Sequence, residues 1–253
     1  ILRFSSIGDI VHSTSVIGTL KSYFPDSSID FMTLSKFAPL VQNHPIINKV
    51  FSVDINDKYF ALRKIGLSIQ ENGYDLVIDL HNTIRSRIIR NAMRKTKSLI
   101  LPKPRWKRFN LFMFHKNNFS SDFSVRSWLH DPIKHLLPRE YKMSETKLSI
   151  SDLEEANGIK FLNDHGLKGD YFVVTPGAAW AQKRWPSNYY SILIDNIKKK
   201  YDLSAVLIGG VNDINCDDIT SISNNTIIDV HGKTNLRESL AIISNAKFIL
   251  GSD

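Results

Sequence analysis

Ser5-Ser6-Ile7-Gly8-Asp9, near the start of the chain, follows an apolar run with strand character and precedes a run with helix character. Pro176-Gly177-Ala178-Ala179-Trp180-Ala181-Gln182-Lys183-Arg184-Trp185-Pro186 lies between two runs of the same kinds past the middle of the chain. Open α/β domains place their ligand contacts at the carboxyl ends of parallel strands, where such loops lie. One loop of this kind in each half predicts two similar domains that face a central cleft.

The chain has 253 residues, which is enough for two domains of roughly 100 to 150 residues. Its composition is 42% hydrophobic and 23% charged, and no apolar run approaches the ~18 residues that a membrane span needs. Cys216 is the only cysteine, so no internal disulfide can form and a cytoplasmic location is expected. The net charge of +8 suits an anionic membrane surface or a small anionic substrate, and we expect no nucleic acid partner.

Strand-like and helix-like runs alternate along both halves, which predicts an α/β fold with parallel sheets. The predicted strands lie at Ile1–Phe4, Ile29–Thr33, Val50–Val53, Leu76–Leu80, Leu99–Leu101, Tyr171–Thr175, Ala205–Ile208, Ile227–Val230 and Phe248–Leu250. Residues 102–118 are irregular and basic, and residues 138–150 resemble a linker. We therefore expect domains at 1–150 and 151–253, and we interpret the chain as a fragment whose second domain is incomplete.

Helix starts are marked by capping signals. Ser151 with Glu154 and Asn235 with Glu238 match the capping box, in which two side chains satisfy the free N–H groups of a first helical turn. The first helix is expected to begin near Ile10.

Asp9 lies at the predicted turn from strand to helix, and Gly8 lets the backbone pass close to a ligand. A carboxylate at this position could act as a general base that accepts a proton from an attacking hydroxyl. The alternative is that Asp9 is the N-cap of the helix, a role that aspartate fills well.

Lys183 precedes a helix that begins near Pro186, and Gly177, Ala178 and Ala179 offer backbone N–H groups beside it. Cation, amides and helix start together suit a phosphate. The alternative is an ordinary solvated lysine. Asp213 follows Gly209-Gly210 and could hold a ribose hydroxyl, as acids do in nucleotide-binding folds.

Asp79, His81, Asn82 and Arg85 cluster at another strand end and suit a polar or anionic substrate, unless they form only a turn and a solvated helix start. The histidines show no metal-ligand spacing, and Asp217-Asp218 is expected on a surface turn, so we predict neither a metal site nor a bound cofactor. The sequence has no G-x-G-x-x-G fingerprint, which disfavours a nicotinamide oxidoreductase.

The opening Ile1-Leu2-Arg3-Phe4-Ser5-Ser6-Ile7-Gly8-Asp9-Ile10-Val11-His12 resembles the N-terminal signature of glycosyltransferase family 9, the bacterial lipopolysaccharide heptosyltransferases. Asp79-Leu80-His81 with Arg85-Ser86 resembles the acceptor-side segment of that family. Pro176-Gly177-Ala178-Ala179 with Lys183-Arg184-Trp185-Pro186 resembles its donor-phosphate segment. Gly209-Gly210, Gly232-Lys233-Thr234 and Gly251-Ser252-Asp253 follow in matching order, so the resemblance spans nearly the whole chain.

This resemblance implies a GT-B fold and a metal-independent, inverting transfer of heptose from ADP-heptose to an acceptor of the lipid A–Kdo type. Asp9 matches the catalytic base, Lys183 the lysine on the donor pyrophosphate, and Asp253 the aspartate on the donor sugar, while Asp213 matches the ribose acid loosely. Gly177, Ala178 and Ala179 then belong to the donor site. The acceptor side comprises Ser6, Gly8, His81, Asn82 and Arg85.

The acceptor implies a peripheral enzyme at the inner face of the cytoplasmic membrane. Three alternatives remain beside the heptosyltransferase, and the nicotinamide oxidoreductase, disfavoured by the missing glycine fingerprint, is the third. A family 9 enzyme could use another nucleotide sugar, and the chain could instead be a non-catalytic protein that binds sugar nucleotides or glycans.

Overall fold

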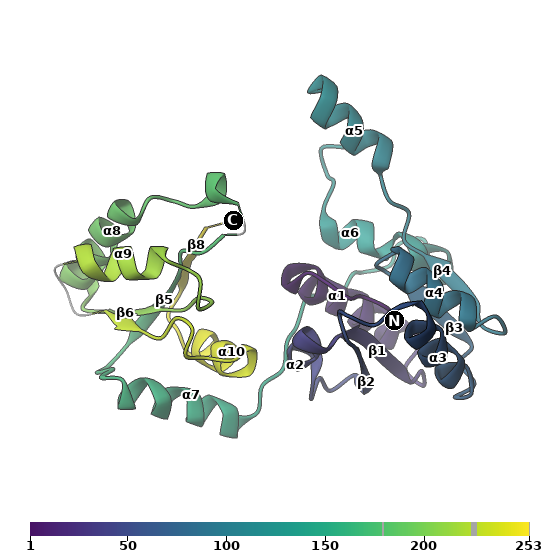
Figure 1. The fold of residues 1–253 in the computed structure, drawn as a ribbon, viewed down its shortest axis with the longest axis horizontal. Helices are drawn as coiled ribbons and strands as arrows, with labels where there is room; N and C mark the ends of the chain where they lie inside the picture. Colours follow the sequence, from purple (N-terminus) through teal and green to yellow (C-terminus); the bar gives the residue numbers. More distant parts are fainter. Residues whose placement is uncertain (179, 224–226, 253) are drawn as a thin grey trace. The chain divides into compact units, whose positions relative to one another are not determined.

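The computed structural model of the chain describes residues 1–178, 180–223 and 227–252. The chain divides into two compact units, Ile1–Ser149 and Ile150–Asp253, and each of them is an α/β unit with a parallel sheet (Figure 1). Within the described ranges, no helix combines the length and the apolar character that crossing a bilayer requires.

The first unit alternates strands and helices up to its last third, which is helical. Its elements are α1 (Ile7–Tyr23), β1 (Ile29–Leu34), η1 (Ser35–Phe37), α2 (Ala38–Val41), β2 (Ile47–Val53), α3 (Tyr59–Gln70), β3 (Leu76–Asp79), α4 (Ile84–Ala92), β4 (Lys97–Ile100), α5 (Arg105–Phe114), α6 (Val125–His130) and η2 (Asp131–Leu136).

The first residues of the chain form the middle of this unit's sheet. β1 pairs with β2 and β3 pairs with β4, all in parallel, and Leu2 bridges Met32 of β1 and Asp79 of β3. The order is therefore β2, β1, the opening segment, β3, β4, which is the doubly wound order with the first strand at the centre. The strand predicted at Ile1–Phe4 takes the form of this bridged segment, because only Leu2 completes a bridge on both sides.

The core of the first unit surrounds the opening segment. Leu2 and Phe4 are buried, and they belong to a cluster with Met32, Leu34 and Val77 from the flanking strands. Because alternate residues of a strand point to the same face, Leu2 with Phe4 and Met32 with Leu34 lie in one packed layer.

The linker predicted at residues 138–150 has no helix or strand, and part of it is docked along α1. The face of α1 that meets it carries small hydroxyl side chains. The Ser144 N–H donates to Thr19 Oγ1 and the Lys147 N–H donates to Thr14 Oγ1, both at 2.9 Å. The low side-chain volume of α1 lets the linker backbone approach and supplies it with hydrogen-bond partners.

The second unit contains α7 (Asp152–Asp164), β5 (Tyr171–Thr175), η3 (Ala181–Lys183), α8 (Ser187–Tyr201), β6 (Ser204–Leu207), α9 (Asn215–Ile222), β7 (Ile228–Asp229), α10 (Leu236–Ser244) and β8 (Ile249–Gly251). Its strands are parallel in the order β7-β6-β5-β8. This is again a doubly wound order with the unit's first strand inside the sheet.

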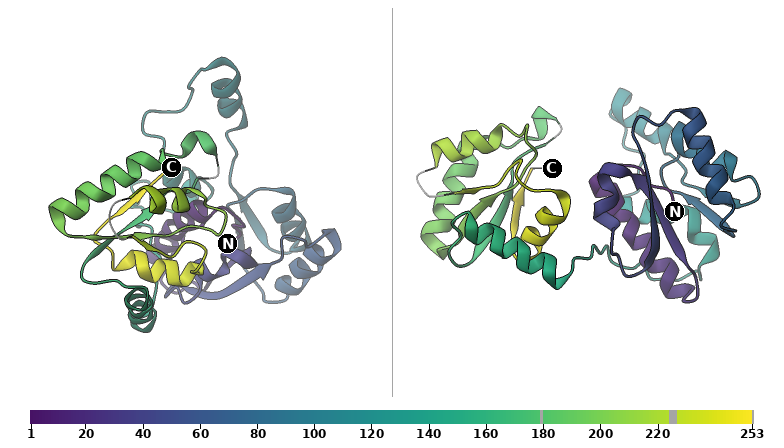
Figure 2. Two further views of the ribbon diagram at one scale, coloured as in Figure 1. Left: turned by 60° about the vertical axis from the view of Figure 1, so that its left-hand side comes forward. Right: turned by 60° about the horizontal axis from the view of Figure 1, so that its bottom comes forward.

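Helices cover both faces of this second sheet (Figures 1 and 2). Phe172 and Val174 of β5 belong to the core cluster that includes α8 and α9, whereas Tyr171 and Val173 belong to the cluster that includes α7 and α10. Both faces are buried because successive side chains of a strand point to opposite sides. This explains why β5 is a continuous apolar run.

Several sequence predictions were wrong in detail. Residues 105–114 form the helix α5 rather than irregular chain, because their aromatic and basic residues support a helix without a clear 3.6-residue apolar period. Asp217 and Asp218 lie in the first turn of α9, where the helix dipole favours carboxylates, rather than on a surface turn. Val125, Trp128, Leu129, Ile133 and Leu136 are spaced as in one helix that would end before Pro138, but the structure divides it into α6 and η2 at Asp131-Pro132, because proline has no N–H to donate.

Candidate active site

Asp9 lies in the first turn of α1, three residues after the N-cap Ser6. The Ser6 backbone N–H and the Ser6 hydroxyl both donate to Asp9 Oδ2 at 3.1 Å. The helix begins at Ile7, three residues earlier than predicted, so the interpretation of Asp9 as the N-cap itself was wrong. Asp9 has a capping role as the partner of Ser6, and this role fixes its carboxylate at the carboxyl end of the opening segment.

Arg3 forms an ion pair with the same oxygen of Asp9 through Nη2. It lies in the central segment, its side chain is 7% exposed, and its Nε donates to the Ser5 carbonyl at 2.8 Å. A second nitrogen, Nη1, donates to the Leu80 carbonyl at the end of β3. Arg3 thus links the end of the opening segment to the end of β3 and holds the Asp9 carboxylate beside them.

Sequence reasoning missed the role of Arg3. The available signal was an arginine inside an apolar strand, since charged residues are almost never fully buried without a partner. Burial lowers the pKa of Arg3, and the Asp9 charge opposes that shift.

The electrostatic environment keeps Asp9 ionised. Burial raises the pKa of Asp9, but the Arg3 charge and the hydrogen bonds from Ser6 outweigh that effect and leave this pKa below its ordinary value. The side chain remains 31% exposed, so a ligand can reach it. Asp9 is therefore an anchored, ionised carboxylate that can accept a proton.

Asp79 lies at the end of β3 and is fully buried, with no exposed surface. Its Oδ1 accepts hydrogen bonds from the backbone N–H groups of His81 and Asn82, at 3.0 and 2.7 Å, and Arg90 pairs with Oδ2 at 3.0 Å. Asp79 therefore shapes the turn after β3, and this turn carries His81 and Asn82 to the same edge as Asp9.

His81 is half-buried beside the opening segment, with its ring edge against Phe4 at 5.4 Å between centroids. Burial lowers its pKa to about 4, helped by the charges of Arg3 and Lys103, so the imidazole is neutral at neutral pH. Its Nδ1 is buried without a hydrogen-bond partner. A neutral imidazole has one nitrogen that donates a hydrogen bond and one that accepts.

Asn82 and Arg85 each donate a side-chain hydrogen bond to a backbone carbonyl group. Asn82 has a φ of 48°, in the left-handed region that asparagine tolerates, and its Nδ2 donates to the Leu101 carbonyl at 2.8 Å. Arg85 lies in the first turn of α4, and its Nη2 donates to the Ile55 carbonyl. The structure thus gathers Ser6, Asp9, His81 and Asn82 around the switch between the opening segment and β3, while Arg85 is anchored on the loop after β2.

In the second unit, the carboxyl ends of β5 and β6 meet around Asp213. The Gly210 N–H donates to Asp213 Oδ2 at 2.7 Å. A Cβ added at Gly177 would lie 2.6 Å from the Asp213 carboxylate, and one at Gly209 would lie 2.8 Å from it. Only glycine fits at either position without displacing Asp213, so the predicted donor loop and the Gly209-Gly210 turn form one packed unit.

Lys183 ends the short helix η3, which follows the Gly177 loop, and its side chain is exposed. The neighbouring Arg184 donates from Nε to the Ala178 carbonyl at 3.0 Å, which ties the two ends of this loop together. Ala179 and Asp253 lie outside the described residues.

The loop is also fixed to the end of β8. The Trp185 N–H donates to Ser252 Oγ at 3.1 Å, and Tyr190 Oη lies 2.9 Å from the same oxygen. The Lys183 segment and the end of β8 are therefore neighbours at the switch between β5 and β8, where ligands bind in open α/β sheets.

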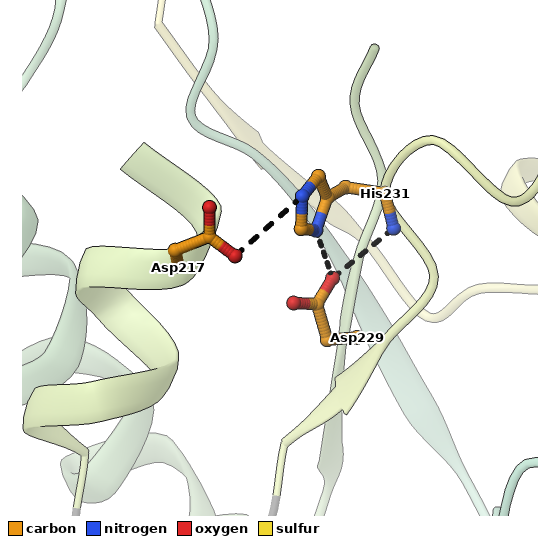
Figure 3. A group of neighbouring side chains, drawn as sticks. All are labelled: Asp217, Asp229 and His231. Carbon is orange, nitrogen blue, oxygen red and sulfur yellow. Dashed lines mark hydrogen bonds and ion pairs between the residues drawn. The ribbon is translucent and has the colours of Figure 1, made fainter. Parts of the chain in front are cut away.

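A separate polar cluster comprises Asp217, Asp229 and His231 (Figure 3). His231 Nδ1 lies 2.6 Å from Asp229 Oδ1, and His231 Nε2 lies 3.7 Å from Asp217 Oδ1. The cluster escaped sequence reasoning because α9 and the end of β7 supply its members from separate segments. The contacts of His231 with the two carboxylates account for the arrangement of the cluster, and we assign it no metal.

Two parallel α/β units in one chain are the architecture of GT-B glycosyltransferases, and solved structures of that class share the fold. A glycosyl transferase family 9 protein from Veillonella parvula matches with a TM-score of 0.83 at 17% identity, over 99% of this chain and 73% of that one. The E. coli ADP-heptose lps heptosyltransferase II matches with a TM-score of 0.72 at 20% identity, over 100% of this chain and 78% of that one.

The chain belongs to glycosyltransferase family 9 (heptosyltransferase), because the sequence model of that family matches residues 62–253. Lipopolysaccharide heptosyltransferase 1 of Campylobacter coli is 28% identical over 49% of this chain, a match that spans 32% of that protein's length. Lipopolysaccharide heptosyltransferase 3 of Escherichia coli is 23% identical over 97% of this chain and 74% of its own length. These matches confirm the family and fold expected from the sequence motifs.

Proposed function

We propose that the protein transfers a heptose from ADP-heptose to the inner core of lipopolysaccharide, either Kdo-lipid A or heptosyl-Kdo-lipid A, with inversion at the anomeric carbon. Membership of family 9 supports the class of reaction. The matched relatives are called lipopolysaccharide or lipooligosaccharide heptosyltransferases. Two solved structures with the same fold are of E. coli heptosyltransferase WaaC, one with ADP and one with ADP-2-deoxy-2-fluoro heptose.

The anchored carboxylate of Asp9 is the observation that carries this proposal. An acceptor hydroxyl attacks the anomeric carbon of the donor, the new C–O bond forms, and the bond from that carbon to the diphosphate breaks. Asp9 accepts the hydroxyl proton, which its ionised state allows at neutral pH. The ion pair with Arg3 and the hydrogen bonds from Ser6 hold the accepting oxygen in place, so little reorganisation precedes the transfer.

The second unit is the proposed donor site. The leaving ADP gains negative charge as the bond breaks, and Lys183 with the N–H groups of Gly177, Ala178 and Ala179 would stabilise that charge. Asp213 would contact the ribose. Asp253 would contact the donor sugar, and its neighbour Ser252 is tied to the segment after Lys183.

The acceptor site is assigned to the first unit. Ser6, Gly8, His81 and Asn82 surround Asp9 or the turn beside it, and neutral His81 can hydrogen-bond a sugar hydroxyl. Arg85 offers a guanidinium for an anionic group of the acceptor. We place the reaction on the cytoplasmic side of the inner membrane, where an ADP-sugar and a lipid-linked acceptor would meet.

The test is a transfer assay with the full-length protein, Kdo-lipid A or heptosyl-Kdo-lipid A, and a panel of nucleotide sugars. Mass spectrometry should detect one added heptose with ADP-heptose and no product with ADP-glucose or UDP-glucose. Product from another nucleotide sugar alone would replace heptose by that sugar. Tight ADP-heptose binding with no product on either acceptor would favour a non-catalytic binding protein.

A further inference from the structure

The helix α5 is exposed on all sides. None of its residues is buried, and Trp106 and Phe112 are 78% and 82% exposed. Figures 1 and 2 show α5 projecting from the rest of the first unit on two connecting segments. Large exposed apolar side chains gathered on one element are unusual for a surface that meets only water, and they mark an interaction site.

The contacts of α5 lie at its base rather than at its projecting part. The Trp128 Nε1–H donates to the Pro102 carbonyl at 2.8 Å, and the Arg108 guanidinium lies 5.5 Å from the Trp128 ring centroid. On the helix itself, Trp106 and Phe109 meet edge to face at 5.8 Å. The helix is thus fixed at one end while its aromatic residues remain available.

The apolar residues are accompanied by positive charge alone. Residues 102–118 contain five lysines and arginines, Lys103, Arg105, Lys107, Arg108 and Lys116, and no aspartate or glutamate. Each lysine or arginine near an anionic lipid surface contributes about 1 kcal/mol of attraction. A short helix with tryptophan, phenylalanine and leucine among basic residues has the composition of helices that lie in the bilayer interface.

We propose that α5 docks the first unit onto a bilayer surface rich in anionic phospholipid, with Trp106, Phe109, Phe112 and Met113 inserted at the level of the headgroups. These four residues share one helical face because each lies three or four positions from another of them. With ten residues, α5 is too short to cross a bilayer, which needs about 20, so the contact is interfacial.

The position of α5 connects this surface to the candidate active site. The helix follows β4 directly, and Leu101 at the end of β4 accepts a hydrogen bond from Asn82, whose turn lies beside Asp9. A bilayer to which α5 is bound would therefore present lipid-linked molecules to the strand ends beside Asp9, the proposed base. This connection rests on the proposed function, whereas the docking itself does not.

The test is sedimentation of the full-length protein with vesicles of phosphatidylglycerol and, separately, of phosphatidylcholine. The wild type should bind the anionic vesicles and bind the zwitterionic ones weakly. Combining Arg105→Gln with Lys116→Gln should weaken binding to anionic vesicles about 30-fold at low salt. Combining Trp106→Ser with Phe112→Ser should weaken it at least about tenfold at any salt concentration.

Matched controls come from α3 of the same unit. Phe60 is 82% exposed, as Phe112 is, and Arg63 and Lys64 are an exposed basic pair. Phe60→Ser and the combined Arg63→Gln, Lys64→Gln variant should bind vesicles as the wild type does. Because no side chain of α5 is buried, its variants should keep the wild-type melting temperature. An unchanged melting temperature would show that a loss of vesicle binding does not come from unfolding.

Three results would overturn the proposal. They are failure of the wild type to bind anionic vesicles, binding by the α5 variants equal to that of the wild type, and a dimer in sedimentation velocity that Trp106→Ser abolishes without vesicle binding. The last result would assign α5 to a second copy of the chain. Vesicle binding without any heptosyl transfer would leave α5 as a docking element and refute only the proposed reaction.

Discussion

Replacing Asp9 by asparagine removes one negative charge and keeps the size of the side chain. The amide oxygen can still accept the hydrogen bonds from Ser6, so the start of α1 should persist. The ability to accept a proton is lost, and loss of a general base lowers turnover by roughly 10² to 10⁴. We expect this loss in the transfer assay, together with an unchanged dissociation constant for ADP in calorimetry.

The same substitution should lower stability by an amount that the geometry sets. Arg3 and Asp9 side chains are 7% and 31% exposed. Breaking a buried pair costs 3–5 kcal/mol and an exposed pair at most about 1 kcal/mol, so this half-buried pair should contribute about 2 kcal/mol. Glu145→Gln is the matched control, since it breaks the exposed Arg126–Glu145 pair of the same unit and should change neither turnover nor melting temperature measurably.

The pH dependence gives an independent check of the Asp9 prediction. Because the pKa of folded Asp9 is lowered, its contribution to stability is present above the ordinary aspartate pKa and is lost as the pH falls through the lowered value. The stability difference between wild type and Asp9→Asn should therefore be constant from pH 8 to pH 5 and shrink below about pH 4. Turnover of Asp9→Asn close to that of the wild type would refute Asp9 as the base.

Four further outcomes are expected. Lys183→Ala should weaken ADP binding about 10- to 100-fold in calorimetry. An unchanged affinity for ADP would show that Lys183 does not bind the diphosphate. Gly177→Ala should also weaken ADP binding, because the new Cβ would displace Asp213, whereas Gly169→Ala, at a surface turn, should leave ADP affinity unchanged. Glu154→Gln should destabilise the protein by about 1 kcal/mol at neutral pH. Hydrogen bonds from Arg237 and Ser151 lower the pKa of Glu154 to about 2. The stability difference between this variant and the wild type should therefore vanish as the pH falls from about 5 to 2. Turnover should persist in excess EDTA, and activity that only Mg²⁺ or Mn²⁺ restores would contradict the metal-independent mechanism.

The parts of the fold with strong local signals were predicted well from the sequence. The predicted strand Tyr171–Thr175 is β5 without any shift, and the predicted capping boxes at Ser151 and Asn235 are those that begin α7 and α10. Such features depend on neighbours within four positions, so the sequence contains all their determinants.

The candidate site was less predictable because its contacts join distant segments. Arg3 meets Leu80, and Gly177 meets Asp213, only after the sheets have formed. The motifs identified the loops, but they did not reveal that Arg3 pairs with Asp9. They also did not reveal that the Asp213 carboxylate leaves no room for a Cβ at Gly177 or Gly209. The helix α5 was missed for a different reason, since the continuous apolar run at residues 111–114 obscures the helical spacing of the apolar residues.

The pairing of Arg3 with Asp9 also governs how the base recovers after each proposed transfer. Once Asp9 has taken the proton it is neutral, and the guanidinium of Arg3, 7% exposed, is left without its counter-charge. That state is unfavourable, and the lowered pKa of Asp9 expresses the same imbalance, so the proton leaves for water as soon as water enters. The arginine thus returns the base to its charged form. Because the pKa of Asp9 is lowered, release of this proton to water should not limit the proposed catalytic cycle.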